Sequence, residues 1–312
     1  MAHRHRANLL MLACAGLLAA APNVPARGAS APLSQTMPAT PPARHAETIL
    51  FVGNSFTFGA RSPLWKFRPE LVTDLNGRHL GGVPVLFKIF TMDAGLHYDV
   101  SVEAVARQGL GFHLKERASL IDRGWDHVVL QDFSTLDRAR PGDARALVAH
   151  AGQLATMLHA KNPRVDILLT ATWARADQVY PATGRWHGQK IEDMARDIRL
   201  AYDAAASASP YIRGVIPVGE AWNRAFVTGF ADPDPYDGIA AGTVNLWARD
   251  NHHASIAGYY LAALMIFGRV TGRDPVSLGA RESAALALGL SGAQTVSLQH
   301  IAQDELAAAQ GH

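Results

Sequence analysis

The chain has almost no cysteine: Cys14 is the only one in 312 residues. This cysteine lies in an N-terminal segment that we interpret below as a cleaved leader, so the mature chain would contain no thiol. A cysteine nucleophile, a disulfide framework and a cysteine-ligated metal site are then excluded.

Long apolar runs and basic clusters are also missing. Beyond the leader, no segment approaches the run of about 18 apolar residues that a membrane-spanning helix needs, so we expect no transmembrane segment in the mature chain. The formal net charge of +2, less the two arginines Arg4 and Arg6 of the leader, becomes 0. Without a basic patch, we expect no nucleic acid partner.

The N-terminal 46 residues have the composition of a targeting segment and a linker. Two arginines precede a Leu/Ala-rich stretch that ends in the small residues of Val24-Pro25-Ala26, which predicts a signal peptide over residues 1–26 and a periplasmic or secreted protein. A lipoprotein signal with Cys14 as its acylation site remains an alternative. Residues 27–46 are rich in Pro, Ala and Ser and are predicted to be a linker.

From Thr48 onward, short apolar runs alternate with longer helical patterns, as in a parallel sheet with helices on both faces. We predict a three-layer α/β/α, flavodoxin-like sandwich whose central parallel sheet has about five strands. The predicted strands are Thr48–Val52, Val100–Ala106, His127–Gln131, Asp166–Thr172 and Ile212–Val218.

Helical patterns follow most of these strands. We predict helices from about residue 141 to 160, over Ile191–Ala206 and over Ala254–Val270, and a helical extension over residues 276–312. The segment Arg61–His97 fits the scheme less well, because its "GGVPVLFKIF" reads as a further strand.

The first predicted strand runs into Gly53-Asn54-Ser55. Ligands of open α/β sheets bind at the carboxyl ends of the strands, so Ser55 is a candidate nucleophile. The alternative is structural, because Asn and Ser are common in turns and at helix N-caps. A nucleophile elbow of the Gly-x-Ser-x-Gly type is excluded, since Thr57 stands where the second glycine would be.

A second polar block, "ARDNHHASIAGYYLAA", lies before the last predicted core helix. Asp250 precedes His253 by three residues, a spacing at which a carboxylate can fix the tautomer of the imidazole and stabilise its protonated form. Two alternatives stay open: a helix cap with exposed histidines, and a metal pair, although no His-Glu-x-x-His motif accompanies it.

Taken together, these blocks resemble the SGNH hydrolases, also called the GDSL esterase/lipase superfamily, and the resemblance extends over Thr48–Pro275. Residues 47–275 are therefore predicted to form an SGNH hydrolase domain. The resemblance implies that Ser55 is the nucleophile, His253 the base and Asp250 the residue that orients it. Ser255 with "GYYLAA", and the stretches "ATWA" and "GEAWNRA", are most similar to a secreted branch of the superfamily.

The resemblance also implies an oxyanion hole made by Ser55, Gly109 and Gln131. The "VARQGLGFHL" block offers Gly109 or Gly111, of which we favour Gly109 for its place along the chain. In "HVVLQDFS", Gln131 stands where the superfamily usually has asparagine. A glutamine carries the same amide donor on a longer stem.

The expected function is that of a secreted serine esterase that forms an acyl-enzyme and needs no cofactor and no metal. Its expected partner is a small-molecule or carbohydrate ester with a short acyl group, with acetyl as one candidate by analogy. Asn54, Phe133, Trp173 and Trp247 are candidate substrate-binding residues, although core packing is the commoner fate of such aromatic residues.

Two functions of other classes remain as alternatives. One is a non-catalytic carbohydrate-binding protein on the same fold. The other is a metal-dependent phosphoesterase that uses Asp132, Asp250, His252 and His253 as metal ligands.

Overall fold

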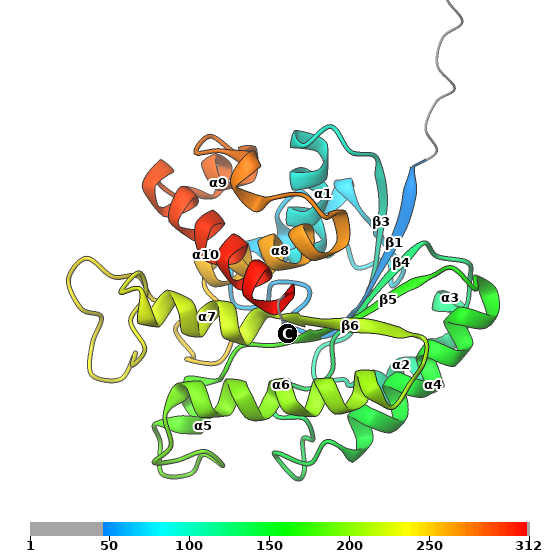
Figure 1. Ribbon diagram of the computed structural model, residues 1–312, viewed down its shortest axis with the longest axis horizontal. Helices are drawn as coiled ribbons and strands as arrows, with labels where there is room; N and C mark the ends of the chain where they lie inside the picture. The colour runs from blue at the N-terminus through cyan, green and yellow to red at the C-terminus, as the bar shows by residue number, and fades with distance from the viewer. Residues whose placement is uncertain (1–45, 311–312) are drawn as a thin grey trace, which may run out of the picture. The chain divides into compact units, whose positions relative to one another are not determined.

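A single parallel sheet organises residues 46–310, which are the residues that this computed structural model describes (Figure 1). The strand order is β2-β3-β1-β4-β5-β6, and every strand pair is parallel. The strands are β1 (Glu47–Gly53), β2 (Thr73–Asp74), β3 (Tyr98–Ala104), β4 (His127–Leu130), β5 (Asp166–Ala171) and β6 (Ile212–Pro217). The predicted α/β class with a central parallel sheet is confirmed.

The five predicted strands are all present, with ends that differ from the predicted ones by a few residues at most. They were recognisable because both faces of the sheet are covered, so the strands read as continuous apolar runs, as in β1, whose last five residues are buried. Strand β2 was missed because it has two residues and pairs only with β3, at the edge of the sheet.

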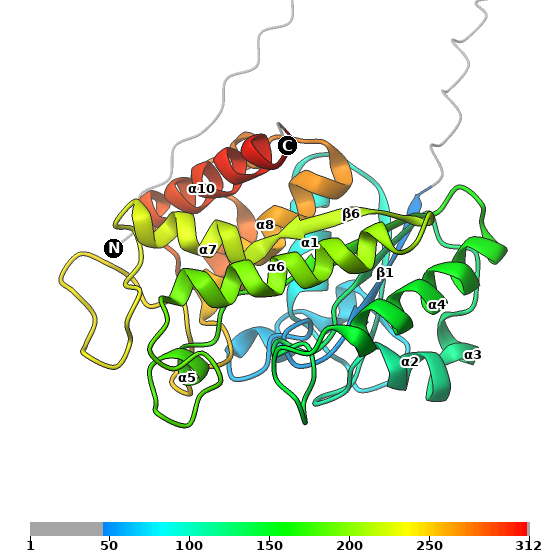
Figure 2. The same cartoon turned by 60° about the horizontal axis from the view of Figure 1, so that its bottom comes forward.

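Helices cover both faces of the sheet (Figures 1 and 2). On one face lie α1, α8, α9 and α10, and on the other lie α2, α4 and α6, while α7 contacts helices of both layers. The α-helices are α1 (Val83–Asp93), α2 (Leu110–Glu116), α3 (Ala118–Ile121), α4 (Arg145–Lys161), α5 (Ala176–Val179), α6 (Ile191–Ser207), α7 (Val218–Val227), α8 (Ile256–Thr271), α9 (Ser283–Leu288) and α10 (Gly292–Gln310). Short 3-10 helices occur at Pro63–Lys66, Pro69–Leu71 and Pro275–Leu278.

The stretch "GGVPVLFKIF", which reads as a strand, forms helix α1 instead. Pro84 stands in the first turn of this helix, where a missing N–H costs nothing, and most of the helix is buried. A helix that is apolar nearly all round shows no 3.6-residue periodicity, which explains the wrong prediction. Gly82, which precedes it, has φ of +85°, and a Cβ there would lie 2.3 Å from the backbone of Phe58.

Helix α8 is likewise buried around almost its whole circumference. It packs against α1 on one side and against α10 on another, and Leu298, Ile301 and Leu306 of α10 are buried. The predicted helical extension after residue 275 therefore packs on the core through α10. Ser255 caps α8, with its Oγ accepting a hydrogen bond from Gly258 N.

The predicted signal peptide, with Cys14, and nearly all of the predicted linker lie outside the described residues. Among the helices of residues 46–310, none combines the length and the apolar character that crossing a membrane requires.

Helix α7 carries a carboxyl group with an unusual titration. Glu220 lies in its first turn, and its Oε1 is 3.6 Å from Nη1 of Arg199 on α6. Burial, only partly offset by the Arg199 charge, raises the pKa of Glu220 to about 7 from 4.5. Between these two pH values the folded chain keeps a proton that the unfolded chain releases, so the free energy of unfolding falls as the pH rises through this window.

We expect Glu220→Gln to remove this pH-dependent fall in the free energy of unfolding. The difference in melting temperature between variant and wild type should grow from pH 4.5 to pH 7 and then stay level, with the variant the more stable above pH 7. Thermal unfolding followed by circular dichroism from pH 4 to pH 8 measures the difference. The exposed Glu116→Gln variant is the control, and a Glu220→Gln curve that runs parallel to wild type would contradict the assignment.

Candidate functional site

Ser55 lies at the carboxyl end of β1, in the first turn after the strand. It is partly exposed, whereas its neighbours Asn54 and Phe56 are 4% and 3% exposed. Its backbone carbonyl accepts hydrogen bonds from Ala60 N at 3.0 Å and from the hydroxyl of Tyr259 on α8 at 3.3 Å. These two hydrogen bonds therefore fix the Ser55 backbone. Its side chain borders a cavity, which is described below.

The side chain of Asn54 joins three loops. Its Nδ2 donates to Gln108 O at 3.0 Å, in the loop after β3, and to Asp132 O at 3.2 Å, in the loop after β4. Its Oδ1 accepts from Phe56 N within the Ser55 turn. Asn54, a predicted substrate-binding residue, borders the cavity beside Ser55, and its polar side-chain atoms hold the carboxyl ends of β1, β3 and β4 together.

Gln131 supports the same turn from behind. Its Oε1 accepts hydrogen bonds from Asn54 N at 3.1 Å and from Thr57 Oγ1 at 3.0 Å, and its Nε2 donates to Asp132 O. Gln131 is 4% exposed and borders a small apolar void of about 20 Å³ rather than the cavity beside Ser55. This placement corrects the expectation that its amide N–H points into the oxyanion hole.

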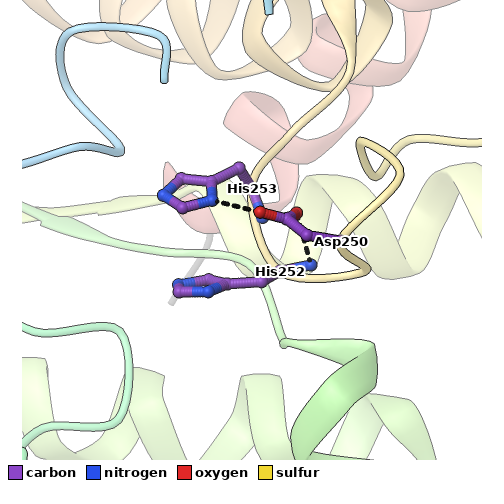
Figure 3. Close-up of side chains that lie close together, drawn as sticks. All are labelled: Asp250, His252 and His253. Atoms are coloured by element: carbon purple, nitrogen blue, oxygen red, sulfur yellow. Dashed lines mark hydrogen bonds and ion pairs between the residues drawn. The ribbon is translucent and has the colours of Figure 1, made fainter. Parts of the chain in front are cut away.

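Asp250 and His253 form a hydrogen-bonded pair in the loop before α8 (Figure 3). The Nδ1 of His253 is 2.8 Å from Asp250 Oδ2, while Asp250 Oδ1 accepts from the backbone N–H groups of His253 and His252. Burial alone would raise the pKa of Asp250, but these hydrogen bonds outweigh it and hold the pKa below its ordinary value. The carboxylate thus fixes one ring nitrogen of His253 in the manner that the spacing predicted.

The other ring nitrogen of His253 is free. Its Nε2 is buried and has no hydrogen-bond partner among the described residues. The His253 ring lies 5.5 Å from the ring of Phe56, the residue that follows Ser55, so the histidine borders the Ser55 turn. No hydrogen bond joins it to Ser55 in this part of the chain, and such bonds are often long or absent in enzymes without substrate.

His252 stacks on His253, with ring centroids 4.2 Å apart and both rings extending in the same direction (Figure 3). It also borders the cavity beside Ser55. Burial, and then the nearby charge of Arg175, lower the pKa of His252 to about 3, so its ring is neutral near pH 7.

The Asp250 loop is attached to the loop after β5 by three hydrogen bonds. Trp173 Nε1 donates to His252 O at 3.2 Å, Trp247 Nε1 donates to Ala174 O at 3.0 Å, and Asp177 N donates to Asn251 O at 3.1 Å. Both tryptophans are 2% exposed, and Trp173 stacks flat against Phe56 at 4.3 Å. Their role in this structure is to pack the loops together, which corrects the expectation of substrate contact.

Gly109 is the N-cap residue of α2 and lies close to the loop after β4. A Cβ at this position would lie 2.3 Å from Asp132 Oδ1 and 2.8 Å from the Phe133 ring, so only glycine fits. Within residues 46–310, the N–H groups of Ser55 and Gly109 donate no hydrogen bond. At Gly111, a Cβ would instead meet the ring of His150 at 2.5 Å, a contact within the α2–α4 layer.

Two adjoining cavities run along the carboxyl ends of the strands. One, of about 320 Å³, is bordered by Ser55, and the other, of about 510 Å³, by Gly109. Arg107, Phe133 and Arg138 border both cavities, so the two cavities adjoin at these side chains and are together called the cleft below. Phe133, a predicted substrate-binding residue, is half-buried and borders both cavities.

Three arginines at the Ser55 cavity, at positions 107, 138 and 175, were not singled out from the sequence. A usable signal was present for two of them, because Arg107 and Arg175 follow closely on the ends of β3 and β5, where ligands of such sheets bind.

The four residues of the phosphoesterase alternative do not come together. Asp250, His252 and His253 offer ligand atoms within 4.8 Å of one another. Asp132 is 2% exposed and accepts hydrogen bonds from Leu110 N and Phe133 N, so it caps α2 instead. Burial raises the pKa of Asp132, which is unfavourable for a metal ligand.

Comparisons with known proteins agree with this architecture. No protein-family model matches the sequence, and no curated protein is similar enough to count as a match. A DUF4886 family protein from Bacteroides uniformis has a similar structure, with a TM-score of 0.58 and 17% sequence identity, over 84% of this chain and 95% of that one. This likeness shows that the two chains share a fold.

Two further solved structures are similar at lower scores. A candidate GDSL-like lipase from Parabacteroides merdae has a TM-score of 0.48 and 15% identity, over 72% of this chain and 95% of that one. A two-domain esterase active on acetylated mannans has a TM-score of 0.43 and 16% identity, over 73% of this chain and 49% of that one. These two likenesses extend no further than the general arrangement of strands and helices.

We expect Asn54→Ala to destabilise the protein by about 2 kcal/mol, because two carbonyl oxygens lose their buried donor at a net value of about 1 kcal/mol each. Urea unfolding at equilibrium measures the change. Gln178→Ala is the matched control, since this amide borders the same cavity but makes only one hydrogen bond, at 3.5 Å. Equal stability of the two variants would show that Asn54 does not hold the loops.

Proposed function

We propose that the chain is a serine esterase of the SGNH hydrolase type, in which Ser55, His253 and Asp250 act as nucleophile, base and orienting carboxylate. The observation that carries the proposal is the state of His253. Its Nδ1 is bound to Asp250, its Nε2 is buried and unpartnered among the described residues, and its ring borders the Ser55 turn. A general base needs this arrangement of one fixed and one free nitrogen.

In the proposed reaction, His253 Nε2 takes the proton of Ser55 Oγ while that oxygen attacks the ester carbonyl carbon. The tetrahedral intermediate collapses by breaking the bond to the alcohol oxygen, which receives the proton from His253. Water then attacks the acyl carbonyl carbon while His253 takes its proton, the bond to Ser55 Oγ breaks, and that oxygen receives the proton from His253 as the carboxylic acid leaves. Asp250 keeps the carboxylate form throughout, in line with its lowered pKa.

The N–H groups of Ser55 and Gly109 are the proposed donors to the oxyanion. Both are without another partner among the described residues, and both lie on loops that Asn54 ties together. Backbone donors fixed in advance in this way need no rearrangement when negative charge develops. Gln131 then serves as a positioning residue, because it holds the backbone of Asn54 and the side chain of Thr57.

The chemistry of the site and the size of its cavities indicate the class of substrate. An acyl-enzyme mechanism suits carboxylic esters, and the cleft of the two adjoining cavities has room for a group the size of a sugar. We propose a short acyl ester as substrate, on the basis that the Ser55 cavity itself is about 320 Å³. Periplasmic or secreted action rests on the predicted signal peptide.

We expect Ser55→Ala to lower kcat for p-nitrophenyl acetate by about six orders of magnitude, because the covalent route is lost. The assay uses purified protein with excess EDTA, which should leave wild-type activity unchanged. Ser134→Ala is the control, since Ser134 borders the same cavity, and it should stay within tenfold of wild type. Activity that survives Ser55→Ala but not EDTA would instead support a metal-dependent hydrolase.

We expect Asp250→Asn to lower kcat by about 10⁴-fold with little change in KM, because an amide at this position favours the wrong tautomer of His253. Steady-state kinetics on the same ester measure the loss. Asp237→Asn, in an exposed loop, is the control. A loss of less than tenfold for Asp250→Asn would show that another group orients the base.

A further inference from the structure

The cavity beside Ser55 has an uneven charge distribution. Arg107, Arg138 and Arg175 border it and no aspartate or glutamate does, whereas the adjoining Gly109 cavity is bordered by Glu116, Asp132 and Asp137 as well as by Lys115. The chain as a whole is close to neutral, with 29 basic and 27 acidic side chains, so three arginines without an acidic residue is a local concentration of charge. Low-dielectric walls around such a cleft strengthen the field inside it.

One of the three positive charges is held in place. The side chain of Arg175 is 15% exposed and forms a two-pronged pair with Asp177, Nε to Oδ1 at 2.9 Å and Nη2 to Oδ2 at 2.6 Å. Its third nitrogen, Nη1, lies 3.5 Å from Ser134 Oγ at the wall of the cavity. Asp177 does not fully cancel this charge at His252. The positive charge of Arg175 lowers the pKa of His252 more than the negative charge of Asp177 raises it.

The other two positive charges are unpaired. Neither Arg107 nor Arg138 forms an ion pair with any residue that the structure describes. Both are exposed, and both border the Ser55 cavity as well as the adjoining Gly109 cavity. They are therefore free to bind a negatively charged group that lies in the cleft.

The backbone at Arg107 adds a second observation. Its φ is +64°, a left-handed conformation that costs a non-glycine residue about 1–2 kcal/mol. Glycine would occupy this position without that cost. The side chain of Arg107 is thus held over the cleft at an energetic cost, a kind of strain that is typical of binding sites.

We propose that the ester hydrolysed at Ser55 carries a carboxylate, and that Arg107 and Arg138, with Arg175, bind that carboxylate in the cleft. Arginine suits this role because its planar guanidinium matches a carboxylate and stays charged. The proposal rests on the proposed esterase function and narrows its substrates to anionic esters. Neutral esters would lack the attraction and bind more weakly.

The first test measures binding, so that it does not depend on turnover. Isothermal titration of the full-length Ser55→Ala variant compares 4-acetoxybenzoate with its neutral methyl ester. We expect the carboxylate to bind at least tenfold more tightly, and the advantage to shrink in 0.5 M NaCl through screening. Equal affinities, or no measurable binding of either ester, would overturn the proposal.

Variants then identify the arginines responsible. In the Arg107→Gln/Arg138→Gln double variant, on the Ser55→Ala background, the preference for the carboxylate should fall about tenfold. Both residues are exposed, which favours correct folding, and circular dichroism checks it. Arg164→Gln is the matched control, because this exposed arginine precedes β5, at the opposite edge of the sheet. A preference that persists in the double variant would contradict the proposal.

Turnover separates this proposal from the esterase function. For each ester, the wild-type kcat/KM is divided by the rate constant of its hydrolysis by imidazole without protein, which corrects for intrinsic reactivity. The corrected kcat/KM should be higher for the carboxylate than for the methyl ester. Ser55-dependent hydrolysis with no such preference would overturn the anionic substrate and leave the esterase standing. Tight, arginine-dependent binding of the carboxylate without any hydrolysis would overturn the esterase and leave the anion-binding cleft standing.

Discussion

The site depends on one amide group. The Nδ2 of Asn54 donates to carbonyl oxygens in the loops after β3 and β4, while its own backbone belongs to the turn after β1. Parallel strands bring their carboxyl ends to one edge of the sheet, but they do not fix the loops that follow. A buried amide with two carbonyl partners does fix them, since breaking the contact would leave polar groups unpaired in the interior.

The opposite wall of the site is fixed by aromatic packing in addition to hydrogen bonds. Phe56 stacks on Trp173, Trp173 stacks on Trp222, and the indole N–H groups of Trp173 and Trp247 donate to loop carbonyls. These contacts attach the Asp250 loop to the end of β5 and bring it against the Ser55 turn. Hydrogen bonds and stacked rings together therefore position the Asp250 loop, whereas the amide of Asn54 ties the Ser55 turn to the loops after β3 and β4.

Much of the fold was predictable because burial on both faces leaves a clear mark on parallel strands. The same burial concealed α1, since a helix covered on nearly all sides loses its periodicity. In the site, the Asp250–His253 hydrogen bond followed from local spacing, and the place of Ser55 at the end of β1 followed from the apolar run before it. A sequence displays both features directly. The roles of Gln131, Trp173 and Trp247 did not follow in this way, because whether an amide or an indole faces a cleft or the interior depends on loops distant in sequence. The same holds for the arginines around Ser55.

The position of α8 between the sheet, α1 and α10 links the Asp250 loop to the last helix of the described chain. The loop with Asp250 and His253 leads into α8, and one side of α8 is covered by α10. Removal of α10 would uncover apolar side chains of α8, so the support at the carboxyl end of the Asp250 loop would weaken although α10 is not part of the loop.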